Sequence, residues 1–75
     1  MEELIKILES VKPDIDYKSE KHLIDEELID SLDIVTIVAK INDEFDIEFP
    51  VSEIVPENFN SAESLYATII RLQEE

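Results

Sequence analysis

The sequence contains no cysteine, no glycine and no tryptophan, and it has a single histidine, His22. Without cysteine the chain forms no disulfide and no thiolate metal site, so the sequence does not record a redox compartment. Without glycine it has no Gly-x-Ser-x-Gly elbow, the turn that exposes the nucleophilic serine of α/β-hydrolases. These absences exclude the commonest sequence signatures of nucleophilic and thiolate-metal chemistry.

Positive charge is also scarce. The chain has 6 Lys and Arg against 20 Asp and Glu, a formal net charge of −14. This charge weighs against nucleic acid and anionic membrane surfaces as partners and favours basic protein surfaces. A hydrophobic content of 44% with clear helical periodicity indicates a folded domain and not a disordered acidic tail.

Long apolar runs are absent, so we expect no transmembrane helix and no membrane insertion. The acidic start, Met1-Glu2-Glu3, is unlike a signal peptide, and we therefore expect a cytoplasmic protein. At 75 residues the chain has room for one domain, residues 1–75, with a small core. We expect this domain to be a monomer.

The stretch 28–45 predicts a central amphipathic helix that begins at the Asp30-Ser31 pair. At about 100° per residue, one arc of this helix is apolar and is expected to face the core. It consists of Ile34, Ile37, Val38, Ile41 and Phe45. A second arc holds Leu32, Val35 and Ala39, which require either a partner or burial on a second side of the helix.

The rest of the chain predicts two further main helices and one short one. A first helix over residues 1–11 ends before Pro13, and residues 13–27 form a long loop pinned by a few apolar side chains. Residues 46–50 are a connection, because no second strand is available to pair with them. We therefore predict an all-α fold, a small four-helix bundle.

Three features are expected after residue 50. Residues 51–55 fit a short helical turn with Ile54 inward, and residues 56–59 fit a turn that puts Phe59 into the core. Residues 60–63 supply an N-cap and capping box for the last helix. Its inward side chains are predicted to be Leu65, Ile69 and Leu72, with Tyr66 and Ile70 at the margin.

Ser31 lies at the start of the central helix. The order Asp30-Ser31-Leu32-Asp33 predicts an N-cap with an acidic group at the third helical position, and the Ser31 hydroxyl should project from the helix start. No residue nearby could activate Ser31 as a nucleophile, because His22 belongs to another segment. We therefore expect no enzymatic activity, and any chemistry at Ser31 requires another protein.

The Asp30-Ser31-Leu32-Asp33 motif, the helix that follows it and the sequence Asp43-Glu44-Phe45-Asp46-Ile47-Glu48-Phe49-Pro50 together resemble the acyl carrier protein family. The resemblance covers essentially the whole chain and implies that family's helical bundle. It implies that a phosphopantetheinyl transferase attaches 4′-phosphopantetheine from coenzyme A to Ser31, between Asp30 and Leu32. The thiol of that arm would carry an acyl or aminoacyl group as a thioester.

The same resemblance implies that partner enzymes dock on the second apolar arc. Acids around an apolar centre attract basic surfaces and steer their approach. The expected docking residues are Asp33, Val35, Ala39 and Asp43. The expected partners are the transferase and the enzymes that activate or transfer acyl or aminoacyl groups.

The sequence does not determine the cargo, that is, which acyl or aminoacyl group the thioester holds. Many fatty-acid carriers have glycine three residues before the serine, where this chain has Leu28. Residues 28–31, 47–51 and 56–59 look closer to D-alanyl and peptidyl carriers. The D-alanyl branch implies an adenylating ligase and teichoic acid modification, whereas the fatty-acid or polyketide branch implies condensing enzymes and reductases. An unmodified acidic helical module that only binds other proteins is the remaining alternative.

We predict no dedicated metal site. His22 has no companion histidine or cysteine and is expected to be an exposed loop residue. Asp25, Glu26 and Glu27 could at most bind a divalent cation weakly together with Asp30, because such acidic clusters are usually solvated.

Overall fold

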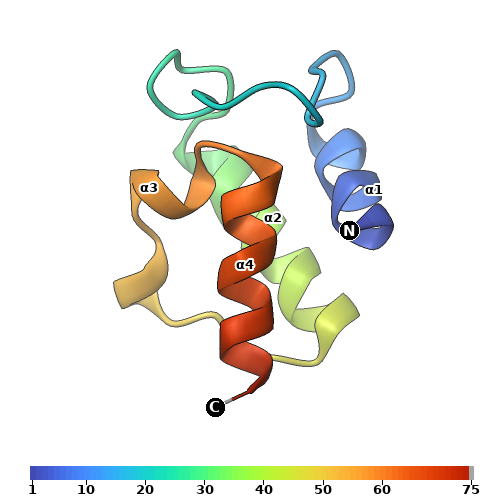
Figure 1. Cartoon of the computed structure of the whole chain (residues 1–75), viewed down its shortest axis with the longest axis vertical. Coiled ribbons are helices and arrows are strands. Elements are labelled where there is room, and N and C mark those ends of the chain that lie inside the picture. The colour runs from blue at the N-terminus through green and yellow to red at the C-terminus, as the bar shows by residue number, and fades with distance from the viewer. Residues whose placement is uncertain (75) are drawn as a thin grey trace.

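The computed structural model describes residues 1–74, and Figure 1 shows them as a bundle of helices with one long connection across one end. These residues contain no strand, which confirms the all-α prediction. The elements are α1 (Glu2–Val11), α2 (Ser31–Phe45), the 3-10 helix η1 (Val51–Glu53), α3 (Pro56–Phe59) and α4 (Ala62–Gln73). Within residues 1–74, none of the helices has both the length and the apolar character needed to span a membrane.

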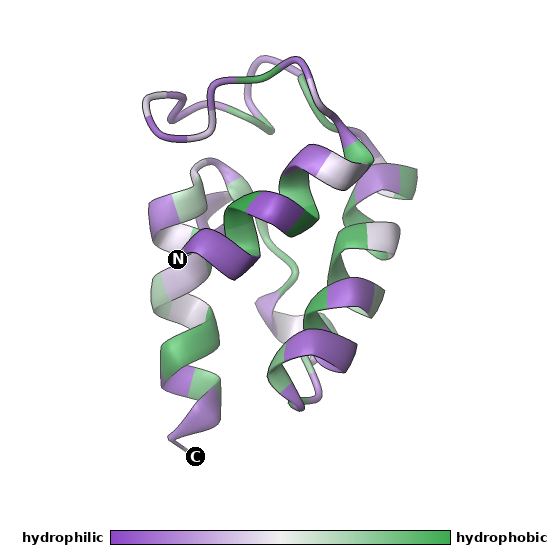
Figure 2. Cartoon of the chain, turned by 90° about the vertical axis from the view of Figure 1, so that its right-hand side faces the viewer, coloured by the Kyte–Doolittle hydropathy of each residue, from purple (hydrophilic) through white to green (hydrophobic). Residues whose placement is uncertain are grey.

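The core lies between the apolar faces of the helices, which turn inward in Figure 2. Ile37 and Ile41 of α2 are completely buried, and the other residues of the predicted core-facing arc are half-buried. The central helix therefore packs as its periodicity predicted. The largest fully buried side chains come from every helix except η1 and also from the connection: Leu4, Leu8, Leu23, Ile37, Ile41, Phe59, Leu65 and Ile69.

The long connection between α1 and α2 is held by specific contacts. Tyr17, Leu23 and Ile29 are buried, which confirms that apolar side chains pin it to the core. Asn60 adds polar contacts: its Oδ1 accepts hydrogen bonds from the backbone N–H of Ile24 at 3.0 Å and of Asp25 at 3.1 Å. Because buried and half-buried backbone groups need partners, Asn60 makes this path of the loop stable.

Tyr17 also ends α1. Its hydroxyl lies 2.6 Å from the carbonyl oxygen of Lys12 and 3.1 Å from that of Leu8. Leu8 lies in the last turn of α1 and Lys12 is its C-cap, a place where backbone acceptors have fewer partners within the helix. Burial, together with the negative charges of Asp33 and Glu9, raises the pKa of Tyr17 to about 12. The neutral phenol is thus the form that fits the fold.

Two expectations after residue 50 were wrong. Residues 56–59 form a short α-helix and not a turn, because Pro56 at its first position has a suitable φ and needs no N–H partner there. The N-cap expected within residues 60–63 is present as Ser61, whose hydroxyl accepts from the N–H of Ser64 at 3.0 Å, but the capping box over residues 60–63 does not form. Asn60 serves the long connection instead.

The segment between α2 and α3 follows the prediction more closely. Asp46 takes a left-handed conformation after α2, and Asn42 Oδ1 accepts from the N–H of Phe49 at 2.8 Å. The rings of Phe49 and Phe59 pack with their centroids 5.5 Å apart. The predicted helical turn over residues 51–55 is present as η1, and Ile54 after it is half-buried.

Glu53 of η1 is tied to the last helix. Its carboxylate accepts hydrogen bonds from the Arg71 guanidinium of α4, and its backbone carbonyl accepts from Asn58 Nδ2 at 2.7 Å. The contact with Arg71 is the main reason why the pKa of the Glu53 carboxyl is lowered. This ion pair links η1 to the C-terminal part of α4. The predicted inward residues of α4 are confirmed, with Leu65 and Ile69 buried and Leu72 half-buried.

Candidate functional site

The start of α2 is a complete capping box. Asp30 is the N-cap, and its Oδ1 accepts from the N–H of Asp33 at 2.9 Å. In the second hydrogen bond of the box, Asp33 Oδ2 accepts from the N–H of Asp30 at 3.1 Å. The predicted N-cap with an acid at the third helical position is confirmed. Two backbone N–H groups that the helix itself would leave unpaired are thereby satisfied.

Ser31 is the first residue of α2 and is exposed. Because Asp30 caps the helix, the Ser31 hydroxyl is not needed for that role. Within residues 1–74, no hydrogen bond holds this hydroxyl. Ile29 on one side is buried and Leu32 on the other is 76% exposed, so the backbone at Ser31 is anchored while its side chain faces solvent.

Charges around the helix start come from two elements. Lys12, which follows α1, places its Nζ 3.6 Å from Asp33 Oδ2. The pKa of Asp30 is lowered, chiefly by the hydrogen bond from the Asp33 N–H and less by the Asp33 side chain and the charge of Lys12. Sequence reasoning missed Lys12, because nothing local indicates that the end of α1 meets the start of α2.

The second arc of α2 is open to solvent. Val35 is 65% exposed, and Ala39 is also exposed. With Leu32 they lie three and four residues apart, so the three side chains follow one another along one side of the helix. The alternative that this arc is buried against a second part of the chain is therefore wrong for residues 1–74.

The acids expected beside this arc differ in exposure. Asp43, near the C-terminal end of α2, is exposed, whereas Asp33 is half-buried within the capping box. Asp43 is three turns from Ser31, so it belongs to the far end of the same helix. Val51 of η1 is 83% exposed and was not singled out from the sequence, because isolated exposed apolar residues leave no periodic signal.

One small apolar cavity lies between α2, α3 and the long connection. It has a volume of about 70 Å³ and is lined by Ile24, Ile34, Ile54, Val55, Pro56 and Phe59. Ile34 is one turn after Ser31 on α2. No polar side chain lines this cavity, so it suits an apolar group.

The residues at the start of α2 fit a covalently attached phosphodiester. A substituent on Ser31 Oγ would project into solvent and displace no hydrogen bond found in the structure. Its phosphate would lie at the N-terminal end of α2, where the positive end of the helix dipole stabilises negative charge. The Lys12–Asp33 ion pair lies at the same end of α2. The expected 4′-phosphopantetheine would thus meet no steric obstacle at Ser31.

The chain matches the protein family described as "Phosphopantetheine attachment site" over residues 2–69. No solved structure matches it. Proteins of this family carry covalently attached 4′-phosphopantetheine, and their domains are carriers that interact with partner enzymes and are not catalytic. The match spans nearly the whole chain, which therefore belongs to the phosphopantetheine-attachment family of carrier domains, in agreement with its resemblance to acyl carrier proteins.

Proposed function

We propose that Ser31 is the attachment serine and that the chain carries acyl or aminoacyl groups as thioesters between partner enzymes. The observation that supports this most strongly is the position of Ser31. It is exposed at the first position of α2, and the neighbouring Asp30 performs the capping that a serine at a helix start often performs. Its hydroxyl is thereby left available for modification.

The attachment step transfers a phosphopantetheinyl group from coenzyme A. Ser31 Oγ forms a bond to the β-phosphorus, the phosphoanhydride bond breaks, and adenosine 3′,5′-bisphosphate leaves. The hydroxyl proton must go to a base. Because no side chain within residues 1–74 hydrogen-bonds to the Ser31 hydroxyl, we assign that base to the transferase.

Partner enzymes would dock along the exposed arc of α2. Leu32, Val35 and Ala39 form an apolar strip that begins beside Ser31, and such strips supply the central contacts of many interfaces. Asp33 and Asp43 flank it at its two ends. With a net charge of −14, the chain would attract basic docking surfaces and accelerate their association.

The cavity beside α2 favours a small cargo. Its volume of about 70 Å³ is well below the roughly 300–1,000 Å³ of an ordinary ligand pocket. A long acyl chain would have to enlarge this cavity, whereas a short group would not. The wholly apolar lining therefore supports a short apolar acyl group as cargo in the general acyl carrier role, in fatty acid, polyketide or related biosynthesis. D-alanine, whose charged ammonium would stay in solvent, is the second candidate cargo on the resemblance of the sequence.

Intact mass spectrometry tests the attachment site. The unmodified chain is incubated with coenzyme A and a broad-specificity phosphopantetheinyl transferase, and we expect a gain of one phosphopantetheine unit. Ser31→Ala should gain nothing, while Ser52→Ala, which removes another exposed serine, should gain the unit as the wild type does. A wild-type chain that gains no mass would overturn the proposal and leave an unmodified interaction module.

The same time course tests the docking surface. Val35→Ser should slow the mass gain at low protein concentration by about tenfold, because removing one central apolar contact costs about 1–2 kcal/mol. Val51→Ser, the same change at another exposed valine, is the control. Equal slowing by both variants would contradict a docking surface confined to α2.

Cargo is then assigned on the phosphopantetheinylated chain. Incubation with ATP, D-alanine and an adenylating ligase is compared with incubation with acyl donors of increasing length and an acyltransferase. The small apolar cavity predicts that short acyl groups load more readily than long ones, and loading of D-alanine by the ligase would support the second candidate cargo. Preferential loading of long acyl chains would show that the cavity does not limit cargo size.

A further inference from the structure

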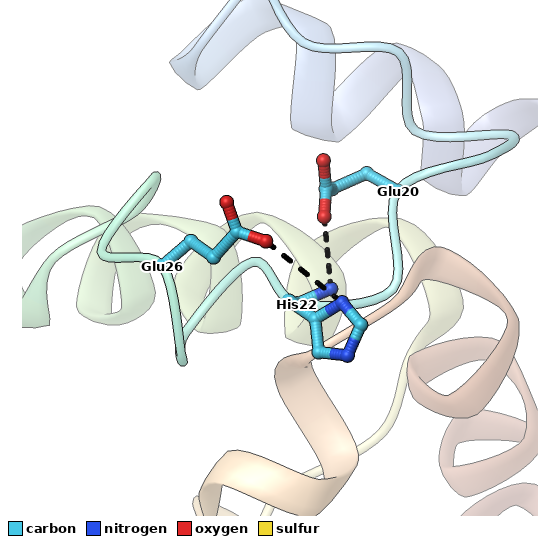
Figure 3. Close-up of side chains that lie close together, drawn as sticks. All are labelled: Glu20, His22 and Glu26. Carbon is cyan, nitrogen blue, oxygen red and sulfur yellow. Dashed lines mark hydrogen bonds and ion pairs between the residues drawn. The ribbon is translucent and has the colours of Figure 1, made fainter.

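The long connection between α1 and α2 holds three side chains whose donor atoms are close enough together to coordinate a metal ion. Glu20, His22 and Glu26 each offer one ligand atom, and these three atoms lie within 4.8 Å of one another (Figure 3). Among residues 1–74 this is the only group of three that meets such a spacing. Glu26 therefore groups with Glu20 and His22, and not with Asp25, Glu27 and Asp30, with which the sequence allowed at most weak cation binding.

The separations between the side chains suit a small cation. His22 Nδ1 lies 4.0 Å from Glu26 Oε2, and Glu20 Oε2 accepts a hydrogen bond from the backbone N–H of His22 at 3.0 Å. Ligands at 2.0–2.2 Å from a tetrahedral zinc ion are about 3.4 Å apart. The three atoms thus need to approach by about 1.4 Å at most, which rotation of the exposed His22 and Glu26 side chains supplies beside the half-buried Glu20.

The backbone beneath the cluster is already ordered. The N–H of Glu26 donates to the His22 carbonyl at 2.9 Å, which closes a turn and brings these two residues to one side. Leu23, between them, is buried, and the next two N–H groups are bound by Asn60 Oδ1. Binding an ion would therefore immobilise side chains only, and preorganisation of this kind raises affinity.

The donor atoms identify the class of ion. Two carboxylates neutralise a divalent charge, and the imidazole nitrogen selects zinc and similar transition ions over magnesium and calcium, which prefer oxygen donors only. No cation competes from Lys21, since its Nζ lies 3.6 Å from Glu63 Oε2 of α4. His22 and Glu26 are largely exposed, so water can complete the coordination.

We propose that Glu20, His22 and Glu26 bind one zinc ion, or a similar first-row divalent ion, through two carboxylates and the His22 Nδ1. The ion would fasten the middle of the connection whose end leads through Ile29 to the capping box and Ser31. This site shares no residue with the attachment site, so the proposal does not depend on whether Ser31 is modified.

Zinc titration by isothermal calorimetry tests the site. The full chain is used without an affinity tag and before modification, because the thiol of phosphopantetheine would itself bind zinc. We expect one zinc per chain, with affinity at least tenfold lower in both His22→Ala and Glu26→Gln. Glu27→Gln changes the charge equally at an exposed neighbour outside the cluster, and it should change affinity less than twofold.

Two results would overturn the site. One is an equal loss of affinity in Glu27→Gln and Glu26→Gln, which would indicate general attraction to an acidic loop. The other is displacement of zinc by an equal concentration of magnesium. A zinc-induced change in the ¹⁵N shift of His22 Nδ1, present in the wild type and in Ser31→Ala alike, would support coordination by the imidazole independently of the carrier role.

Discussion

At the scale of single residues, Tyr17 shows how one hydroxyl stabilises the end of an element that proline terminates. The residue is 3% exposed, and its hydroxyl reaches the carbonyls of Leu8 and Lys12 at the end of α1. Pro13 alone would stop the helix but would leave those acceptors without this partner. The sequence predicted a buried side chain at Tyr17 but not the role of its hydroxyl.

Tyr17→Phe should keep the buried ring and lose both hydrogen bonds. We expect the free energy of unfolding to fall by about 1–2 kcal/mol, because the carbonyl acceptors lose a buried donor while the packing is retained. Urea unfolding followed by circular dichroism measures this. An unchanged midpoint would mean that water replaces the hydroxyl at no cost.

The same variant tests the pH dependence. The pKa of Tyr17 is raised from 10.0 to about 12, so the folded state favours the neutral phenol. The stabilisation is complete below pH 10 and is lost as the pH rises through about 12. The wild type should therefore lose more stability than Tyr17→Phe between these two pH values. Parallel losses in the two proteins would contradict this role for Tyr17.

At the scale of elements, local patterns were sufficient for α1, α2 and α4, and they failed where a distant residue decides. The capping box at Asp30 and Asp33 was predictable because its partners are three residues apart. Asn60 was included in the stretch expected to cap α4, but it bonds to Ile24 and Asp25, which are 36 and 35 residues away. Sequence spacing contains no information on such a contact.

The short helix α3 was missed for a related reason. Residues 56–59 are too few for a periodic pattern, so a turn and a helical turn look the same in the sequence. Burial of Phe59 against Phe49 selects the helical form.

For the functional site, the motif at Ser31 could be recognised in the sequence. The exposure of Leu32 and Val35 could not be predicted, because it depends on how the whole bundle packs.

Asn60→Ala tests how the long connection is held. Loss of the Oδ1 acceptor leaves the N–H groups of Ile24 and Asp25 without their partner, and we expect the free energy of unfolding to fall by about 2 kcal/mol. Hydrogen exchange should accelerate at these two amides. The Leu23 amide, which donates to the Asn60 backbone carbonyl at 2.9 Å, is the internal control and should change less. Equal acceleration at all three would indicate that the whole connection detaches.

At the scale of the whole molecule, the dominant feature is the density of negative charge. A net charge of −14 is confined to a body of 31 × 22 × 21 Å. At 0.01 M salt the screening length is about 30 Å, so each charge acts on nearly all others, whereas at 1 M it is about 3 Å. The last turn of α2 contains no base and carries Asp43 and Glu44, where the helix dipole also disfavours acids.

Salt should therefore stabilise the domain. We expect the melting temperature to rise by about 5 °C between low and high NaCl, corresponding to about 1 kcal/mol for a domain of this size. The paired variant Glu44→Gln/Glu48→Gln removes two exposed acids near the end of α2, so it should melt higher at low salt and respond less to added NaCl. Magnesium chloride at the same ionic strength as NaCl separates charge screening from specific binding of magnesium. Screening alone predicts that the melting temperature rises equally with ionic strength in both salts. A melting temperature that does not respond to either salt would show that the paired bases, Lys12, Lys21 and Arg71, already offset the repulsion.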